Sequence, residues 1–474
     1  MRGVYSVEEV RAAEEALMAR LPDGALMARA ATGLAVECVR LLDGVYGRRV
    51  VLLVGAGNNG GDALYAGAAL GRRGARVEAM LLNPERAHDA GRTALTAAGG
   101  RIVPVNADAL AGADLVVDGI VGIGGSGGLR GAAVPLARAA RDLLTVAVDV
   151  PSGVAADTGA AGDDSVHADV TVTFGALKPG LLVGDGARRT GELRLVDIGL
   201  DATLPAVRTQ VLEVADVAAL LPTPTVADDK YTRGVVGLVS GSAAYPGAGV
   251  LSTGAAICGG AGMVRYAGPA ADAIRAHYPE VVVQEGARPS DLQVQAWVIG
   301  PGIGTDDAAR ESLADVLGTQ VPVIVDADGI TLLGQSPELL RGRTAPTVLT
   351  PHDREFARIA DGPSADRLGS VRAAARDLGV SVLLKGNATV VAAPDGRAWI
   401  NRTGTPWLGT AGSGDVLSGL IGSLLAAGQD APLAAALGAY AHGVAGQLAA
   451  VDGPPSAIDV LRALRGALRT ITAG

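Results

Sequence analysis

The stretch RVVLLVGAGNNGGD at residues 49–62 decides the fold class. It starts with a continuous apolar run, Arg49 to Val54, of the kind found in strands that are buried on both faces. We expect a tight loop from Gly55 to Gly61, a helix from Asp62 to Arg73 and a second strand from Ala75 to Leu82. A strand, a glycine loop, a helix and another strand make a βαβ unit, so the sequence predicts an α/β fold with a parallel sheet.

The rest of the first half keeps this alternation. Ser6 and Glu9 form a capping-box pattern that predicts a helix to about Arg20, and a second helix is expected from Ala25 to Leu42. Further strands are expected to end at Asp118, Asp149 and Phe174, and a last one runs from Leu193 to Ile198.

The chain between Leu200 and Asp229 becomes rich in Pro, Thr and Ala, and we place the domain boundary there, giving domains 1–208 and 209–474. The second domain begins afresh with a strand at 234–239, a glycine loop and a helix. It continues with strands at 296–299, 321–325, 347–349 and 380–384, a hairpin at 390–400 and helices to its end. The two halves share no period, so we expect two different α/β domains and not a repeat.

Composition excludes several classes of protein. The 474 residues include 40 Lys and Arg against 49 Asp and Glu, a net charge of −9, and 3% are aromatic, which argues against a nucleic-acid binder. Two cysteines, Cys38 and Cys258, exclude a disulfide framework and favour a reducing, cytoplasmic compartment. The stretches 234–264 and 431–451 carry almost no charge, but they are rich in Gly or Ala and are interpreted as buried segments, so no membrane association is expected.

The glycine loop after the first strand predicts a phosphate site. Residues 55–60 match G-x-G-x-x-G between a strand and a helix, where backbone N–H groups and the helix N-terminus attract an anion. A dinucleotide-dependent dehydrogenase is one interpretation, but Glu78, its candidate ribose ligand, lies inside a strand and not at its end. Asn58, Asn59 and Asp62 favour a different use of the loop, because amides and a carboxylate can ligate a cation or hold hydroxyl groups.

Two acids and a second glycine loop are expected beside this first loop. Asp118 and Asp149 each end an apolar strand, and in open α/β sheets ligands bind at the carboxyl ends of the strands. A glycine-rich loop, Gly122 to Gly128, follows Asp118, and Ser152 lies in a turn just after Asp149. The sequence therefore predicts a concave site at this edge of the sheet.

The second half carries its sharpest signal at Gly412-Ser-Gly-Asp415, which opens a helix expected from Val416. Small residues at a helix N-terminus leave amide groups free to bind an anion, and Asp415 beside it can deprotonate a hydroxyl that attacks a phosphoryl group. Other polar groups follow strands: Lys385 to Thr389 for a nucleotide, Gly300 to Gly304 as a turn, Asp326 and Asp328 to help arrange magnesium, and His352.

The first-half motifs resemble the NAD(P)H-hydrate epimerase domain over residues 1–205, which is a Rossmann-like three-layer αβα domain. The resemblance rests on Gly57 to Asp62, on Val117-Asp118 with the following glycine loop, and on Asp149 to Gly153. It implies that Asp149 does acid/base work and that Asn59, Asp118 and Ser152 bind potassium. The substrate residues that it implies are Asn58, Asn59, Gly60, Gly61, Asp62, Gly122, Ile123, Gly124, Gly125, Ser126, Gly127, Gly128 and Asp149.

The second-half motifs resemble the ribokinase-like superfamily, and within it the ADP-dependent NAD(P)H-hydrate dehydratases, over residues 213–472. The match rests on Gly247-Ala248, residues 260–264, Val325 to Asp328, Leu349 to His352 and Leu384 to Gly386. It implies a ribokinase-like αβα domain in which Asp415 is the base and Mg²⁺ accompanies ADP. The hydrate would be bound by Ala248, Gly302, Gly304, His352 and Asp415, and ADP or AMP by Lys385, Gly386, Asn387, Ala388, Thr389 and Gly414.

Both resemblances together imply a bifunctional enzyme that repairs hydrated nicotinamide nucleotides. The first domain would interconvert the R and S hydrates, and the second would use ADP to dehydrate the S form, giving AMP and phosphate. The expected partners are these small molecules and further copies of the chain. Two alternatives stay open: an ATP-dependent kinase of a small alcohol or vitamin precursor with a regulatory first domain, and a nucleotide-sensing scaffold.

Overall fold

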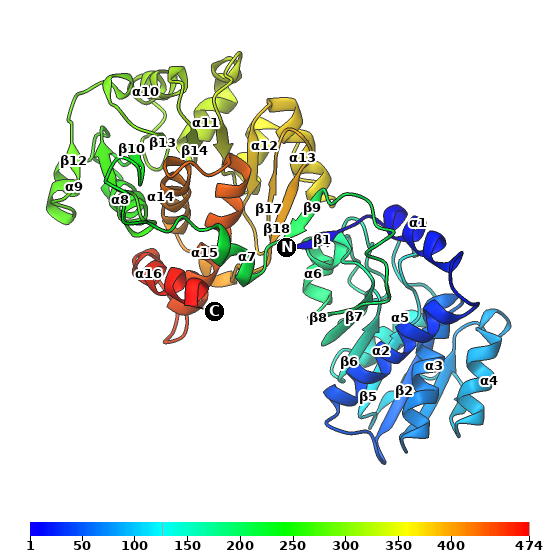
Figure 1. The fold of residues 1–474 in the computed structure, drawn as a ribbon. Coiled ribbons are helices and arrows are strands. Elements are labelled where there is room, and N and C mark those ends of the chain that lie inside the picture. The colour runs from blue at the N-terminus through cyan, green and yellow to red at the C-terminus, as the bar shows by residue number, and fades with distance from the viewer. Residues whose placement is uncertain (126, 474) are drawn as a thin grey trace. The chain divides into compact units, whose positions relative to one another are not determined.

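A computed structural model describes residues 1–125 and 127–473 and divides the chain into two compact units (Figure 1). The first unit comprises Gly3 to Arg208. The second comprises the chain from Thr209 onward together with Met1 and Arg2. The predicted first domain, 1–208, includes these two N-terminal residues, so the structure differs from the prediction there. Met1 and Arg2 belong with the second unit because the terminal amino group pairs with Asp216 at 2.5 Å and Arg2 pairs with Glu213 at 2.6 Å.

The first unit contains a seven-stranded, fully parallel sheet in the order β4-β3-β2-β5-β6-β7-β8. The strand order reverses between β2 and β5, which makes this the switch point where ligands bind in open α/β sheets. Its strands are β2 (Arg49–Val54), β3 (Arg76–Leu81), β4 (Arg101–Val103), β5 (Leu115–Gly119), β6 (Thr145–Val148), β7 (Val170–Phe174) and β8 (Glu192–Val196).

Helices cover both faces of this sheet. Alternate residues of β2 point to opposite sides: Val50, Leu52 and Val54 join one buried cluster, and Val51 and Leu53 join another, so the unit has three layers. The helices are α1 (Val7–Met18), α2 (Ala25–Leu41), α3 (Asn58–Arg72), α4 (Asp89–Ala97), α5 (Ala133–Ala140) and α6 (Gly184–Arg189), with short 3₁₀ turns η1 (Pro84–Arg86), η2 (Asp108–Leu110) and η3 (Pro179–Leu181).

The second unit is built on an eleven-stranded sheet in the order β1-β9-β18-β17-β16-β15-β14-β13-β10-β11-β12. Strands β10 to β16 run parallel, whereas β17 is antiparallel to both of its neighbours. The order reverses between β10 and β13. The strands are β1 (Arg2–Val4), β9 (Thr209–Val211), β10 (Val235–Val239), β11 (Met263–Tyr266), β12 (Val282–Val283), β13 (Ala296–Ile299), β14 (Val323–Val325), β15 (Thr347–Leu349), β16 (Ser381–Leu384), β17 (Thr389–Ala392) and β18 (Ala398–Asn401).

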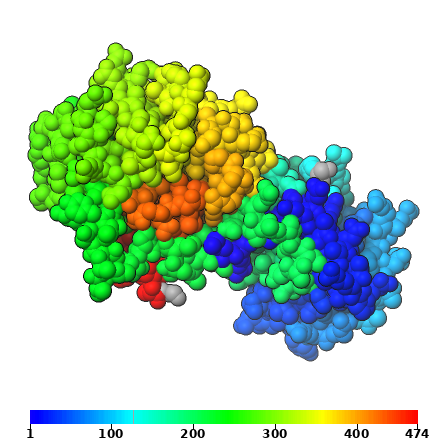
Figure 2. Space-filling model, turned by 45° about the horizontal axis from the view of Figure 1, so that its top comes forward, coloured from blue at the N-terminus to red at the C-terminus, as the bar shows by residue number. Residues whose placement is uncertain are grey.

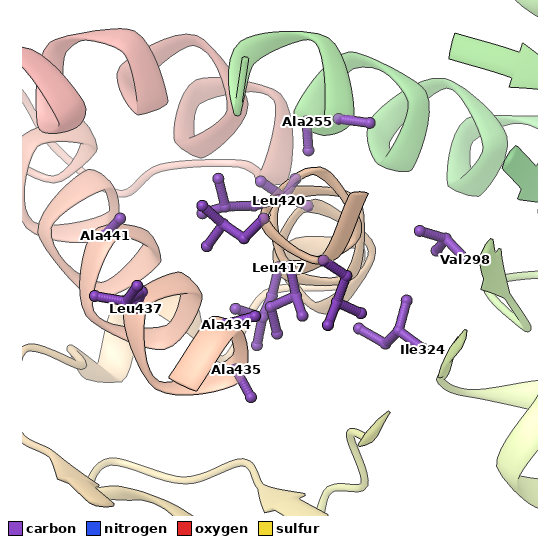
Figure 3. Packing of buried hydrophobic residues seen from close by; sticks show 14 of the residues in the cluster. Ala255, Val298, Ile324, Leu417, Leu420, Ala434, Ala435, Leu437 and Ala441 are labelled. Carbon is purple, nitrogen blue, oxygen red and sulfur yellow. The ribbon is translucent and has the colours of Figure 1, made fainter. Parts of the chain in front are cut away.

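Helix α14 lies at the centre of the second unit's core. Leu417 and Leu420 pack between α8 and α15, and Val298 and Ile324 face them from the sheet (Figure 3). The helices are α7 (Val214–Leu220), α8 (Pro246–Cys258), α9 (Ala271–His277), α10 (Asp307–Gly318), α11 (Asp328–Gln335), α12 (Asp353–Ile359), α13 (Arg367–Leu378), α14 (Ser413–Ala426), α15 (Ala431–Ala449) and α16 (Ala457–Ala473), with 3₁₀ turns η4 (Pro289–Asp291), η5 (Pro337–Leu340) and η6 (Pro406–Leu408).

The two-domain α/β prediction is confirmed, but two helix starts were placed too late. Helix α3 begins at Asn58 and not at Asp62, and α14 begins at Ser413 and not at Val416. In both cases a glycine with positive φ, Gly57 at 97° or Gly412 at 90°, reverses the chain so that the helix starts at the next residue. No helix among the described residues combines the length and the apolar character needed to cross a bilayer.

Candidate active sites

The two glycine loops of the first unit meet at the switch point. A Cβ on Gly55 would collide with the carbonyl oxygen of Ile120, so the chain after β2 and the chain after β5 touch through bare backbone. A Cβ on Gly122 would lie 2.8 Å from Oδ1 of Asn59. The structure thus brings the predicted residues 58–62, now in the first turns of α3, together with the start of the loop from Gly122. Ser126 of that loop lies outside the described residues.

Asp118 is completely buried and bound by protein donors. Its carboxylate accepts hydrogen bonds from Ser152 N at 2.8 Å and Ser152 Oγ at 2.6 Å, and from Ile120 N at 3.2 Å. Burial raises the pKa of Asp118 to about 6, although these hydrogen bonds oppose the shift. No Lys, Arg or His pairs with Asp118 in the described part of the chain, and the nearby Asn59 amide nitrogen is buried without a partner. A buried acid without a cationic side chain suits a bound cation.

Asp149 is held in a strained conformation by a buried lysine. Its φ is 65°, which a non-glycine residue rarely adopts. Lys178, 1% exposed, donates to Asp149 Oδ1 at 2.6 Å and to Thr173 Oγ1 at 2.9 Å, and Thr173 donates to the same carboxylate oxygen at 3.0 Å. The ammonium is thereby neutralised and one edge of Asp149 is fixed.

Asp62 lies near Asp149 and is 8% exposed. Burial raises the pKa of Asp62 to about 8, and the negative charges of Asp149 and Glu14 add to the shift. The carboxyl of Asp62 has no hydrogen-bond partner within the described residues. At neutral pH this side chain is therefore a neutral acid in a cluster of carboxyl groups.

Glu78 is not available to bind a ribose. Its carboxylate accepts two hydrogen bonds from Arg49, the shorter at 2.7 Å, across neighbouring strands. A dinucleotide-dependent dehydrogenase would need a free acid here to bind the ribose, so the pairing of Glu78 with Arg49 argues against that interpretation.

In the second unit, the N-terminus of α14 lies beside Lys385. Gly412, with φ 90°, precedes the helix, and Asp415 is in its first turn. A Cβ on Gly414 would lie 3.3 Å from Lys385 Nζ and 3.7 Å from Asp326 Oδ2. Backbone carbonyls accept from the N–H groups of Ser413 and Asp415, and no such bond is made by Gly414 N within the described residues. The N-terminus of α14, an ammonium group and a carboxylate therefore converge at the predicted anion site.

A buried network surrounds Asp415. Lys385 Nζ donates to Asp326 Oδ1 at 2.8 Å and lies 3.6 Å from Glu355, while Ser418 Oγ donates to Asp326 Oδ2 at 2.6 Å. Burial, with the charge of Asp326 in second place, raises the pKa of Asp415 to about 7 against the opposing effect of Lys385. Asp415 is thus poised to take up a proton near neutral pH.

The loops after β10 and β13 contact each other, and a Cβ on Gly300 would collide with the carbonyl oxygen of Asp326. A Cβ on Gly302, whose φ is 64°, would lie 2.8 Å from the Ala248 side chain, and Gly304 N donates to Asp328 Oδ2 at 2.9 Å. The structure brings Ala248 and Gly302 together, and their role in hydrate binding stays a prediction. Asp328 is used to hold this loop, and Asp326 is used to hold Lys385.

His352 has a structural task in addition to its predicted one. Its Nδ1 accepts from the backbone of Arg354 and Glu355 and caps α12, while its Nε2 lies 3.4 Å from Glu355. The side chain is half exposed, so Nε2 remains accessible to a ligand.

The predicted nucleotide loop, Lys385 to Thr389, packs on the chain that leads to α14. A Cβ on Gly404 would lie 2.6 Å from the carbonyl oxygen of Asn387. In Figure 2 the orange segment, near residue 400 on the colour bar, reaches the surface of this unit next to yellow and green segments.

Several site residues were missed by the sequence analysis: Glu14, Glu355, Ser418 and the ion-pair roles of Lys178 and Asp326. Each gives a weak local signal, because an acid in an amphipathic helix or a helical serine is usually a surface residue. The described residues contain no group of three His, Cys, Asp or Glu side chains placed to hold a metal ion.

Comparisons with known proteins agree for both units. A family model described as NAD(P)H-hydrate dehydratase matches residues 236–461, and one described as YjeF-related protein N-terminus matches residues 23–180. The bifunctional NAD(P)H-hydrate repair enzyme Nnr of Mycobacterium tuberculosis is 53% identical over 445 residues, 92% of each chain. That of Mycobacterium leprae is 51% identical over 463 residues, 96% of each chain.

Two solved structures are similar to the second unit. The ADP/ATP-dependent NAD(P)H-hydrate dehydratase of Bacillus subtilis, co-crystallised with ATP and Mg²⁺, has a TM-score of 0.50 and 28% identity, and the match covers 55% of this chain and 98% of that one. A ribokinase-like superfamily protein of Enterococcus faecalis has a TM-score of 0.52 and 26% identity over 57% of this chain and 99% of that one. The ribokinase-like prediction is confirmed.

Proposed function

Because this chain belongs to the family of bifunctional NAD(P)H-hydrate repair enzymes, we propose how its two units divide that work. The chain is an enzyme with an epimerase and a dehydratase activity. The first unit interconverts the R and S hydrates, and the second dehydrates the S hydrate. The convergence of Asp415, Lys385 and the N-terminus of α14 in one anion site carries this assignment.

The second unit converts a poor leaving group into a good one. Asp415 takes the proton of the C6 hydroxyl of the S hydrate while that oxygen attacks the terminal phosphoryl group of ADP, so AMP leaves. The positive end of the α14 dipole, with Gly414 N, and the ammonium of Lys385 stabilise the charge on the migrating phosphoryl group. Phosphate then leaves C6 as the ring double bond returns. Ala248, Gly302, Gly304 and His352 contact the hydrate in this proposal.

The nucleotide binds along Lys385, Gly386, Asn387, Ala388 and Thr389, with Gly414 at its phosphates. Mg²⁺ fits here as a companion of the nucleotide: it keeps water ligands and binds chiefly through phosphate oxygens, with few carboxylates. Both carboxylate oxygens of Asp326 already accept hydrogen bonds, one from Lys385 and one from Ser418, so few lone pairs remain to coordinate Mg²⁺ directly. The bound ion supplies charge neutralisation to the phosphates.

In the first unit, Asn58 to Asp62, the loop from Gly122 and Asp149 bind the hydrate, with Asp149 at the epimerising carbon. Potassium fits between Asn59, Asp118 and Ser152, because Asp118 is a buried carboxylate with no cationic side chain beside it in the described chain. The ion would balance the charge of Asp118 and hold the two loops in register. Two free cysteines, one of them buried, support a reducing cytoplasmic location, and a homo-oligomer stays a prediction.

The test is to incubate the purified chain with separated R and S hydrates, Mg²⁺ and either ADP or ATP, in potassium or in tetramethylammonium buffer. We expect S hydrate to yield NAD(P)H with ADP and release of AMP and phosphate. We expect R hydrate to disappear only when potassium is present. A phosphorylated alcohol as the stable product would instead support the kinase alternative, and binding without turnover would support the sensor.

A further inference from the structure

Helix α1 turns two charged side chains toward the first unit's site. Arg11 and Glu14 are three residues apart and lie on the same face of the helix. A Cβ on Gly124 would lie 3.0 Å from Arg11 Nη2, so the guanidinium rests against the bare backbone of the second glycine loop. Neither side chain forms a hydrogen bond or an ion pair with the described residues.

The helix is fastened firmly enough to place these side chains. Ser6 and Glu9 form the predicted capping box, with Ser6 N donating to Glu9 Oε2 at 2.8 Å. The backbone of Val7 donates to Asp157 at 2.7 Å, and the backbone of Tyr5 donates to Leu177 at 2.9 Å. Val10 and Ala13 on the adjoining face are buried in the core of the unit. Arg11 and Glu14 are therefore directed by a docked helix and not by a free end.

Arg11 has the chemistry of a phosphate contact. A guanidinium with no acidic partner presents a planar fork of donors that matches phosphate oxygens. It lies against a glycine loop whose backbone the proposed function already assigns to the nucleotide. The substrate carries a diphosphate at a distance from its reacting ring, so one site needs both a phosphate contact and groups at the ring.

Glu14 lies on the side of the ring-binding acids. Burial raises the pKa of Glu14, Asp149 raises it further, and Lys178 and Arg11 oppose the shift. Of Glu14, Asp62 and Asp149, it is Asp149 that pairs directly with the ammonium of Lys178. Carboxyl groups gathered in this way favour a retained proton, and Asp62 is the buried member that no hydrogen-bond donor of the described residues contacts.

Resting on the proposed function, we propose that α1 completes the epimerisation site. Arg11 binds the diphosphate of the hydrate. Glu14 is a positioning residue that keeps Asp62 protonated, and Asp62 is the acid that donates to the C6 hydroxyl. That hydroxyl leaves as water when the C6–O bond breaks and the N1 electron pair forms an N1=C6 iminium. Water then adds to the other face, and the proton that it releases returns to the Asp62 and Asp149 pair, so protons and water balance.

The groups that face Asp62 set the direction of its pH dependence. They are Asp149 after β6 and Glu14 on α1, with Lys178 and Arg11 beside them. His88, the residue before α4, would lie 3.1 Å from a Cβ on Gly61, and on β5 the carboxylate of Asp118 is hydrogen-bonded to Ser152. Because the pKa of Asp62 is about 8, the acid is lost above that pH, and epimerisation falls there.

The test compares Arg11→Gln, Glu14→Gln and Asp62→Asn in the full chain, with Glu15→Gln as the matched control because Glu15 is the exposed neighbour on the same helix. Conversion of R hydrate is followed without ADP, and each preparation's dehydration of S hydrate with ADP reports the unaltered second unit. Arg11→Gln should raise KM about tenfold at nearly constant kcat. Asp62→Asn should lower kcat by roughly 100-fold or more. Glu14→Gln should move the alkaline limb to lower pH, and Glu14→Asp should restore it.

The outcomes separate the inference from the function beneath it. If the unmodified chain does not epimerise R hydrate, the proposed function fails. If it does, an unchanged KM in Arg11→Gln would refute the phosphate contact of Arg11. An unchanged pH profile in Glu14→Gln would refute the positioning role of Glu14. An effect of Asp62→Asn on KM alone reduces Asp62 to a binding residue and overturns its role as acid.

Discussion

Asp415 must be ionised to act as a base, and its surroundings keep its proton until the pH is near neutral. Burial is the largest cause of its raised pKa of about 7, and the charges of Asp326, Asp328 and Glu355 act in the same direction. Lys385 opposes them. Because the ionised form is the active one, dehydration should rise with pH through about 7 and then level off.

The first prediction concerns the replacement Asp415→Asn. It should lower dehydration of S hydrate by roughly 100-fold or more and abolish the rise of the remaining rate through neutral pH. The folded-state pKa lies above that of an exposed Asp, so ionised Asp415 costs stability as the pH rises toward 7, and the neutral variant should have a higher Tm at pH 8. Asp272→Asn, at a fully exposed carboxylate, serves as control. Wild-type turnover by Asp415→Asn would refute the assignment.

The sequence predicts which acids lie at strand and helix ends, but not the side chains that pair with them and fix their charge and orientation. Asp149 and Asp415 were predictable because glycine loops and apolar strands flank them. The pairing of Asp149 with Lys178 joins residues 29 positions apart, and that of Asp326 with Lys385 joins residues 59 positions apart. Glu14 looks like any acid of an amphipathic helix until the fold places it beside Asp62.

At the scale of the element, the N-terminus of α14 contains two glycines with different tasks. Gly412 has φ 90° and lets the chain reverse, and a Cβ there would also lie 2.6 Å from Leu251 Cδ1. Gly414 is helical, and its missing side chain leaves room in front of Lys385. One glycine therefore serves folding and the other serves the anion site.

This difference gives the second prediction. Gly414→Ala should fold normally, because alanine favours a helix, but its Cβ enters the phosphate site and should raise KM for ADP about tenfold. Gly412→Ala should instead lower the free energy of unfolding by about 1 to 2 kcal/mol, because of the strained backbone. Thermal unfolding and ADP titration of both variants separate the effects. Equal losses of stability in the two would contradict this division.

Most elements could be predicted because continuous apolar runs and turn residues mark buried parallel strands. The strands that were missed, such as β4 and β12, are short edge strands with exposed residues, and β9 lies inside the stretch rich in Pro, Thr and Ala. Helix starts were placed late because the glycines and asparagines that open α3 and α14 have low helix propensity, and tertiary contacts override that preference.

At the scale of the whole molecule, each unit has its own sheet, its own core and its own switch point. The first site gathers residues that follow β2, β5 and β6, and the second gathers residues that follow β13, β14 and β16 together with the N-terminus of α14. No residue assigned to one reaction belongs to the other unit. The two activities should therefore be separable by single substitutions.

Independence of the two units can be tested by mixing two variant chains, Asp149→Asn and Asp415→Asn, each inactivated in one unit. Asparagine tolerates the positive φ at position 149, and its Oδ1 can still accept from Lys178, but the buried ammonium loses its counter-charge, so thermal unfolding must first show that the first unit of this variant is folded. Each chain is first given R hydrate and ADP by itself. With Asp149→Asn, R hydrate should be lost no faster than in a blank without enzyme. With Asp415→Asn, R and S hydrates should equilibrate without yielding NAD(P)H. The mixture should consume both, because each hydrate is a free small molecule that one chain can release and another can bind. If the mixture stalls while the unmodified chain proceeds, the hydrate passes between sites only within one chain or assembly, and the independence of the units is lost.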